Sequence, residues 1–401
     1  MSLSKLEETP ELLARRAVMN REILETVQAK LAENPSWDLN GEIRGLAMDA
    51  LKKHFAHPTA KLLQERRKPP PPKPQNFTAV LVRSPEKTVI LNPLSDAAKT
   101  LIFGAIGEED GGVEDEDSLD KGVCRVLRHA EVIAKLSGRG GVLRCGGGSG
   151  SDIAIKVVPA SETTAFETEY SALLYLAENA PDFPAPKPHG LIGLGDSRLM
   201  LMSYIPSTTL KSVWPTLSDS NKLSIQRQLN QIFMRLREFK QKDRRLGGLG
   251  GEGVSDHHAW VDHADTETVM TTATVFRDFQ FSIKAPCGPE YAAFLKSLLP
   301  HPDPDEPAVF THGDFFPGNI MVDLDPTKAQ EYVVSGIVDW ETSGFYPAWF
   351  EASKVLYTFN ESGRGTMQDW WKYVPSCIAP ASRPVEWAVG RLWDKANGID
   401  A

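Results

Sequence analysis

The chain has 401 residues, of which 41% are hydrophobic and 24% charged, values ordinary for a globular protein with more than one core. Its net charge of −9 at pH 7 argues against nucleic acid or an anionic membrane surface as the main partner and is compatible with a cationic substrate. The sequence contains no run of 18 apolar residues and no apolar signal core after Met1, so we expect a cytoplasmic protein without a membrane span.

Residues 1–67 are predicted to form a helical N-terminal extension. Apolar residues fall on one stripe from Leu13 to Leu31, behind a helix start at Thr9-Pro10, and a second stripe runs from Ile43 to His54. Both stripes are suited either to docking on the rest of the chain or to binding a partner.

Residues 68–118 are expected to connect this extension to the main part of the chain. Pro69 to Pro74 predicts an extended spacer, with an SH3-type ligand as the alternative. Two β-like runs, Thr78–Val82 and Thr88–Leu91, predict a hairpin. The acidic block from Glu108 to Asp120 repels itself and is expected to be a solvated loop.

From Leu119 the pattern changes to strand, turn and strand, and beyond Pro206 helices dominate. We assign residues 119–206 to a small antiparallel β lobe and residues 207–401 to a larger, mostly helical lobe. In the small lobe, strands are expected at Val132–Leu136, Val142–Cys145, Ile153–Val158, Leu191–Leu194 and Leu199–Met202, with a helix at Thr163–Glu178.

Lys156 interrupts the apolar strand Ile153–Val158. Alternation places it with Ala154 and Val158 on one face, opposite Ile153, Ile155 and Val157. An amine on an apolar cleft face needs an anionic partner, for which the phosphates of a nucleotide are suited. An edge-strand lysine that faces water is the alternative.

The segment Thr311-His312-Gly313-Asp314, with Asn319 five residues on and Asp339 at the end of a later apolar run, indicates phosphoryl transfer. That chemistry needs one carboxylate to accept a hydroxyl proton, and an amide and a second carboxylate to hold Mg²⁺ on the phosphates of ATP. A hairpin of Ile320–Val322 with Val333–Val338 would bring Asp339 back beside Asn319. Asp314 or Asp339 alone would more simply be a turn residue.

The set His312-Gly313-Asp314…Asn319…Asp339-Trp340-Glu341 resembles the aminoglycoside phosphotransferase and choline kinase superfamily, most closely its fungal branch. The resemblance runs from about Leu119 to the C-terminus. It implies an α+β, bilobal protein kinase-like fold. It also implies that Asp314 is the general base and that Asn319 and Asp339 bind Mg²⁺. His312, Trp340 and Glu341 are expected to support the loop rather than to act on substrate.

In the small lobe, the resemblance implies that Glu169 pairs with Lys156, with Glu167 as the alternative. It places the phosphates of ATP under the turn that contains Ser137, Gly138 and Gly140, and treats Gly146–Asp152 as a hairpin turn. Met202–Pro206 resembles the hinge whose backbone groups, at Met202 and Tyr204, read adenine. Ser203 and Ser207 depart from the family pattern there.

The sequence Asp256-His257-His258 with His263 suggests metal ligands, although the Gly-rich stretch before it favours a loop. The resemblance places variable substrate contacts here, so Glu252, Asp256 and Asp262 are candidates to meet a substrate amine.

The resulting hypothesis is an ATP- and Mg²⁺-dependent phosphotransferase that moves the γ-phosphate to a hydroxyl of an aminoglycoside-, choline- or sugar/amino-alcohol-like small molecule. The alternative is a catalytically silent kinase-like module that binds nucleotide or a partner. A protein kinase is a weaker interpretation, because Gly313 stands where those enzymes carry Arg and no Ala-Pro-Glu segment follows.

Overall fold

The computed structural model describes residues 10–34, 88–104, 116–135, 140–146, 152–161, 163–239, 241, 243–254, 269–282, 287–303, 305–328, 331–356, 367 and 369–396. The chain divides into two compact units, Met1–Gln75 and Asn76–Ala401. Helix α1 (Pro10–Glu33) lies in the first unit, where the Leu13–Leu31 stripe predicted it. The predicted second helix, the proline spacer and the strand Thr78–Val82 lie outside the described residues. Among the described helices, none has the length and apolar character needed to cross a membrane.

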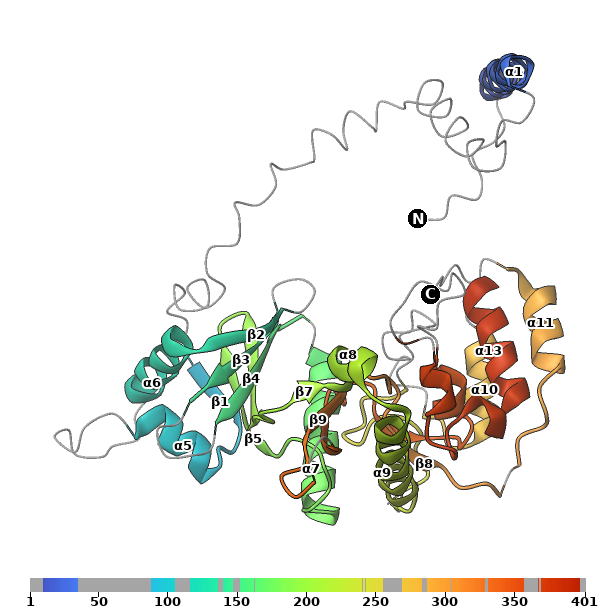
Figure 1. Cartoon of the computed structure of the whole chain (residues 1–401). Coiled ribbons are helices and arrows are strands. Elements are labelled where there is room, and N and C mark those ends of the chain that lie inside the picture. The colour runs from blue at the N-terminus through green and yellow to red at the C-terminus, as the bar shows by residue number, and fades with distance from the viewer. Residues whose placement is uncertain are drawn as a thin grey trace. The chain divides into compact units, whose positions relative to one another are not determined.

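An antiparallel sheet of six strands forms the small lobe in the second unit (Figure 1). The strand order is β1-β5-β6-β4-β3-β2, which puts the lysine strand β4 between β3 and β6. Lys156 therefore pairs with Val142 on one side and Met200 on the other. The strands are β1 (Thr88–Asn92), β2 (Glu131–Lys135), β3 (Gly141–Cys145), β4 (Ile153–Pro159), β5 (Pro188–Leu194) and β6 (Ser197–Ser203).

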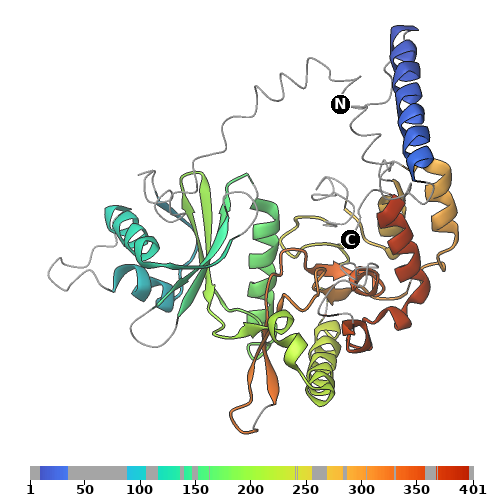
Figure 2. The same ribbon diagram turned by 45° about the horizontal axis from the view of Figure 1, so that its top comes forward.

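Helices cover both faces of this sheet. Helices α5 (Asp96–Phe103) and α6 (Glu116–His129) lie on one side, and α7 (Thr163–Asn179) lies on the other, as two views show (Figures 1 and 2). Ile153, Ile155 and Val157 pack in the core that includes α5 and α6, whereas Ala154 and Val158 belong to the core that includes α7. The predicted alternation along β4 is thus confirmed, and it sends Lys156 toward α7.

The first strand and two helices of this lobe come largely from a stretch that the sequence pattern assigned to a linker, a β-hairpin and an acidic loop. Strand β1 pairs with β5, with Thr88 opposite Leu194, and the backbone N–H of Thr88 donates to Asp120 Oδ1 at 2.7 Å. Helix α6 buries Leu119 and Leu127 against the sheet. The acidic residues favoured a loop in the sequence analysis, although the apolar residues recur at helical spacing. The predicted strand Thr88–Leu91 is confirmed as β1, although it pairs with β5. The linker and acidic-loop interpretation missed α5 and the start of α6, while the domain limits at 118 and 206 stay predictions.

In its described residues, the larger lobe is mostly helical and carries two small sheets. In one of them, β9 and β10 form the predicted hairpin, with Ile337 opposite Ile320. The observed architecture confirms the predicted α+β, two-lobed fold class. The elements of this lobe are β7 (Thr208–Thr209), α8 (Leu210–Val213), η1 (Trp214–Thr216), α9 (Asp219–Arg237), α10 (Ala273–Ser282), α11 (Pro289–Ser297), β8 (Val309–Thr311), β9 (Ile320–Leu324), β10 (Tyr332–Ile337), β11 (Gly344–Tyr346), α12 (Phe350–Lys354), η3 (Trp370–Lys372), η4 (Pro380–Ser382) and α13 (Pro384–Ala396).

Candidate active site

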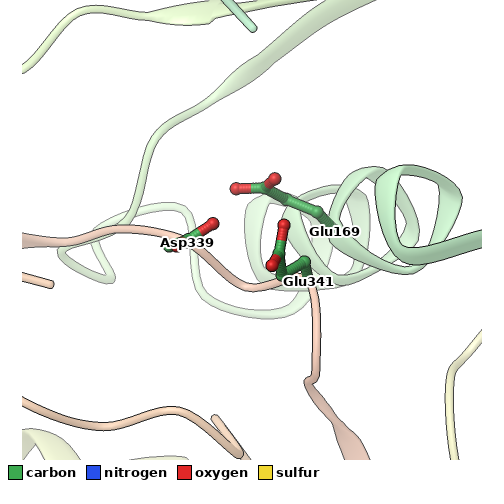
Figure 3. A group of neighbouring side chains, drawn as sticks. All are labelled: Glu169, Asp339 and Glu341. Carbon is green, nitrogen blue, oxygen red and sulfur yellow. The ribbon is translucent and has the colours of Figure 1, made fainter. Parts of the chain in front are cut away.

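The Lys156 ammonium joins the two lobes. Its Nζ lies 2.6 Å from Glu169 Oε2 on α7 and 2.8 Å from both Asp339 Oδ1 and Glu341 Oε2, which follow β10. Figure 3 shows the three carboxylates turned toward one another. Their oxygens lie within 4.8 Å of each other, so the group is also a set of hard oxygen donors of the kind that Mg²⁺ takes.

Burial and charge oppose each other in this cluster. Burial alone lowers the pKa of Lys156, but the carboxylates of Glu169, Asp339 and Glu341 outweigh it and raise that pKa well above its usual value. Burial raises the pKa of Glu169, and Lys156 opposes that rise. The positive charge therefore stays on Lys156, and the predicted partner is Glu169 rather than Glu167, whose side chain is exposed.

The loop before Asp314 is fixed by its own backbone. Gly313 has φ 84°, and a Cβ atom there would lie 2.5 Å from the carbonyl oxygen of Thr342. Only glycine meets both conditions without strain, which explains why no arginine stands at this position. Thr342 Oγ1 donates to the carbonyl oxygen of His312 at 3.0 Å.

His312 supports the loop through both ring nitrogens. Nε2 lies 3.0 Å from the carbonyl oxygen of Val338, and Nδ1 accepts from the backbone N–H of Asp314 at 3.3 Å. This pattern requires the proton on Nε2 and a neutral ring. Burial lowers the pKa of His312 to about 4, which agrees. The ring is fully buried, as a supporting role predicts.

Asn319 is tied directly to Asp314. Its Nδ2 donates to the carbonyl oxygen of Asp314 at 2.9 Å and to Asp314 Oδ2 at 3.1 Å. Its backbone carbonyl accepts from Val338 N at 2.9 Å, one residue before Asp339. Because Nδ2 donates, Oδ1 is the Asn319 atom that would bind a cation.

Asp339 has φ 67°, a left-handed conformation that few residues other than glycine adopt. The next residue, Trp340, is fully buried, and its indole N–H donates to the carbonyl oxygen of Ile337. The backbone N–H of Trp340 donates to Glu169 Oε1 at 3.3 Å. Asp339 and Glu341 thus emerge on either side of an anchored tryptophan, which turns both carboxylates toward Lys156.

Among the described residues, the remaining predicted nucleotide contacts lie near the ends of strands in the small-lobe sheet. Gly140 is buried just before β3, whereas Ser137 and Gly138 lie outside the described residues. Met202 pairs with Ala154 across β6 and β4. The backbone N–H of Tyr204 donates to the carbonyl oxygen of Asp152, so in this structure it extends the sheet.

Glu252 has a partner inside the protein. It is buried, and its carboxylate accepts from Ser171 Oγ at 3.1 Å and from the backbone N–H of Gly250 at 2.8 Å. These contacts tie the Gly-rich loop to α7. The other candidates of that segment, Asp256, Asp262 and the three histidines, lie outside the described residues.

Two carboxylates of the site were missed or undervalued from sequence. Glu341 was expected only to support the loop, yet it contacts Lys156. Glu351 was not considered, yet it accepts from the backbone N–H groups of His312 and Gly313. The signal for Glu351 was present, because it is an acid placed between Phe350 and Ala352 in an apolar run.

Comparison with known sequences agrees with this geometry. Residues 138–374, more than half of the chain, match the model of the phosphotransferase enzyme family (APH). The chain belongs to this family. A search of curated proteins found no match.

Solved structures with a similar fold include the aminoglycoside-3'-phosphotransferase of type VIII, at 19% identity and TM-score 0.41, over 67% of this chain and 93% of that one. Another is APH(3'')-Id from Streptomyces rimosus, at 18% identity and TM-score 0.42, over 69% of this chain and 98% of that one. The amicoumacin kinase hAmiN has 13% identity and TM-score 0.36, over 67% of this chain and 73% of that one. At these low values, the family assignment rests on the matched residues.

Proposed function

We propose that the protein is an ATP- and Mg²⁺-dependent phosphotransferase that moves the γ-phosphate of ATP to a hydroxyl of a small molecule. The observation that carries this proposal is the contact of Lys156 Nζ with both Glu169 and Asp339, since it joins the lysine strand to the residue expected to bind metal. Family membership supports the same class of reaction.

Nucleotide binding is proposed for the small lobe. Lys156, held by Glu169, would bind the phosphates, and the turn with Ser137, Gly138 and Gly140 would cover them. Backbone groups at Met202 and Tyr204 would contact the adenine. The backbone N–H of Tyr204 already donates to the carbonyl oxygen of Asp152, so the carbonyl group of Tyr204 is the one proposed to contact the base.

The large lobe would supply the metal site and the base. Asp339 and Asn319 offer a carboxylate and an amide oxygen, which fit Mg²⁺. When bound, Mg²⁺ would neutralise charge on the transferred phosphate. Asp314 would accept the proton of the attacking hydroxyl, and Asn319 Nδ2 keeps its carboxylate in place at 3.1 Å.

The acceptor would be an aminoglycoside-, choline- or sugar/amino-alcohol-like molecule that enters from the large lobe, in the cytoplasm. The net charge of −9 is compatible with a cationic acceptor. Neither nucleic acid nor a membrane is proposed as a partner.

A screen of amines, alcohols and sugars for consumption of ATP, with GTP in parallel, tests the proposal. Asp314→Ala should lower turnover on the order of 10²-fold or more and leave the thermal shift with Mg-ATP nearly unchanged. Equal turnover in the variant would exclude Asp314 as the base.

Asp339→Ala should weaken the binding of Mg-nucleotide, measured as a smaller thermal shift with Mg-ATP. An unchanged shift would count against the metal role of Asp339. A shift with Mg-ATP in the wild-type protein, without turnover on any acceptor, would favour the alternative of a silent nucleotide-binding module.

A further inference from the structure

A cavity of about 380 Å³ lies on the side of α7 that faces away from Lys156, and its volume is within the range of small-molecule sites. The Gly-rich stretch 247–251 of the large lobe forms part of its wall. Four side chains of α7 form another part: Ser171, Leu174, Tyr175 and Glu178. Successive residues of a helix are turned by about 100°, so these four point about 140–240° away from Glu169. The cavity is therefore separate from the carboxylates that hold Lys156.

The two parts of the wall are joined by hydrogen bonds. Glu252, at the end of the Gly-rich stretch, accepts from Ser171 Oγ at 3.1 Å and from the backbone N–H of Gly250 at 2.8 Å. At the other end, Gly247 donates its N–H to the carbonyl oxygen of Phe345 at 2.9 Å and accepts from the N–H of Phe345 at 3.0 Å. The loop is thus fixed to α7 on one side and to β11 on the other.

The most deeply buried side chains of the wall are aromatic. The rings of Tyr175 and Phe345 meet edge to face with 5.9 Å between their centroids, and both side chains are buried. Leu174 and Leu249, which are partly exposed, add further apolar surface. A ligand group that contacts these residues would lose apolar surface to water, which is favourable by about 25 cal/mol for each Å².

The charges of the wall favour a cation. Glu178 lies in the last turn of α7, where the carbonyl groups carry partial negative charge and no basic residue compensates it. Among the described residues, no cation pairs with the exposed carboxylate of Glu178. Asp243 pairs with Arg245 at 3.5 Å, but both side chains are 63% exposed, so water weakens this pair. One negative charge therefore remains at the wall without a partner.

We propose that this cavity is a binding site for a small organic amine, with its apolar body against Tyr175, Phe345 and Leu249 and its ammonium group beside Glu178. The inference goes beyond the proposed function, because none of these residues has a role in the proposed reaction. Binding at this site can be measured without turnover.

Three probes of one shape test the proposal on the full-length protein: phenethylamine, phenethyl alcohol and phenylacetate. Saturation-transfer NMR titrations should give a Kd on the order of 1 mM for the amine, at least about 10-fold tighter than for the alcohol, with phenylacetate the weakest. Glu178→Gln should bring the affinity for the amine to within about twofold of that for the alcohol. Glu167→Gln is the matched control, because Glu167 is an exposed acid of the same helix outside the wall, and it should bind the amine as wild type does.

Further variants separate this cavity from the proposed reaction site. Leu174→Trp fills the cavity and should weaken binding of the amine at least about 10-fold, whereas Asp314→Ala and saturating Mg-ATP should leave it unchanged. If Leu174→Trp fails to fold, the exposed substitution Glu178→Gln decides.

No binding of the amine, equal affinity for the three probes, or no effect of Glu178→Gln would overturn the proposal. Loss of binding in Asp314→Ala, or displacement by Mg-ATP, would also overturn it, because the amine would then occupy the proposed reaction site. If no acceptor is turned over, the proposed function fails, and these titrations still decide whether the cavity binds an amine.

Discussion

Replacement of Lys156 by methionine should lower the free energy of unfolding, mainly because it leaves the buried carboxylate of Glu169 without its cation. Glu169 has 2% of its side chain exposed and lies 2.6 Å from Nζ, and loss of one member of such a pair costs about 3–5 kcal/mol. Asp339 and Glu341, at 35% and 33% exposed, are solvated and should add less than about 1 kcal/mol each.

Protonation limits this loss. In the variant, Glu169 can take up a proton and so avoid being a buried charge without a cation. Because the ordinary pKa of Glu169 is 4.5, its protonation at pH 7 costs a free energy of about 3 kcal/mol. The loss in Lys156→Met should therefore be about 3 kcal/mol at pH 7 and below about 1 kcal/mol at pH 5. The sign follows because the folded variant takes up a proton that the unfolded chain does not hold at pH 7.

Urea unfolding followed by tryptophan fluorescence measures this difference. The double variant Lys156→Met/Glu169→Leu should recover most of the loss, since apolar groups of similar volume replace the buried pair. Lys328→Met is the control, because Lys328 pairs with Glu331 in water and should matter little. A loss below 1 kcal/mol at pH 7, or one that does not change with pH, would refute this reasoning.

Two further outcomes follow from the loop. Gly313→Ala combines a positive φ with a contact of 2.5 Å, whereas Gly288→Ala has a similar φ of 78° and open space. The first should lose clearly more than the roughly 1–3 kcal/mol of backbone strain expected for the second, whose ψ of 159° is also unfavourable for alanine, and equal melting temperatures would contradict this. Burial raises the pKa of Glu351 to about 7 and lowers that of His312 to about 4. When the pH falls from 7 to 4.5, the folded protein takes up a proton on Glu351, which raises its free energy of unfolding, whereas the unfolded chain takes up a proton on His312, which lowers it. Glu351→Gln lacks the first effect. Its free energy of unfolding in urea should therefore decrease relative to that of wild type by about 3 kcal/mol over this range. A gap that stays constant with pH would exclude this burial effect.

Local patterns predicted the elements that hold the expected catalytic residues. The alternation around Lys156 and the turn between Ile320 and Ile337 depend on neighbours in sequence, and both were confirmed. The third partner of Lys156 could not be foreseen in the same way, because Glu341 lies 185 residues away and its contact depends on how Trp340 is buried. The strand at Thr88–Leu91 was predicted, but its pairing with β5 was not, because β5 follows about a hundred residues later. Contacts between distant segments leave no periodic trace in either one.

The connection between the lobes is held firmly on both of its sides. The backbone N–H of Tyr204 donates to Asp152 before β4, so Tyr204 moves with the small sheet. One residue later, Ile205 lies so close to Gly336 that a Cβ atom there would approach its Cδ1 to 2.3 Å, and Ser207 Oγ contacts Ser335 Oγ at 2.8 Å. The chain therefore passes from the small sheet to the large lobe between two adjacent residues, Tyr204 and Ile205, each fixed to a different lobe. A substitution at either one would loosen the backbone on one side of the crossing and leave the other side held.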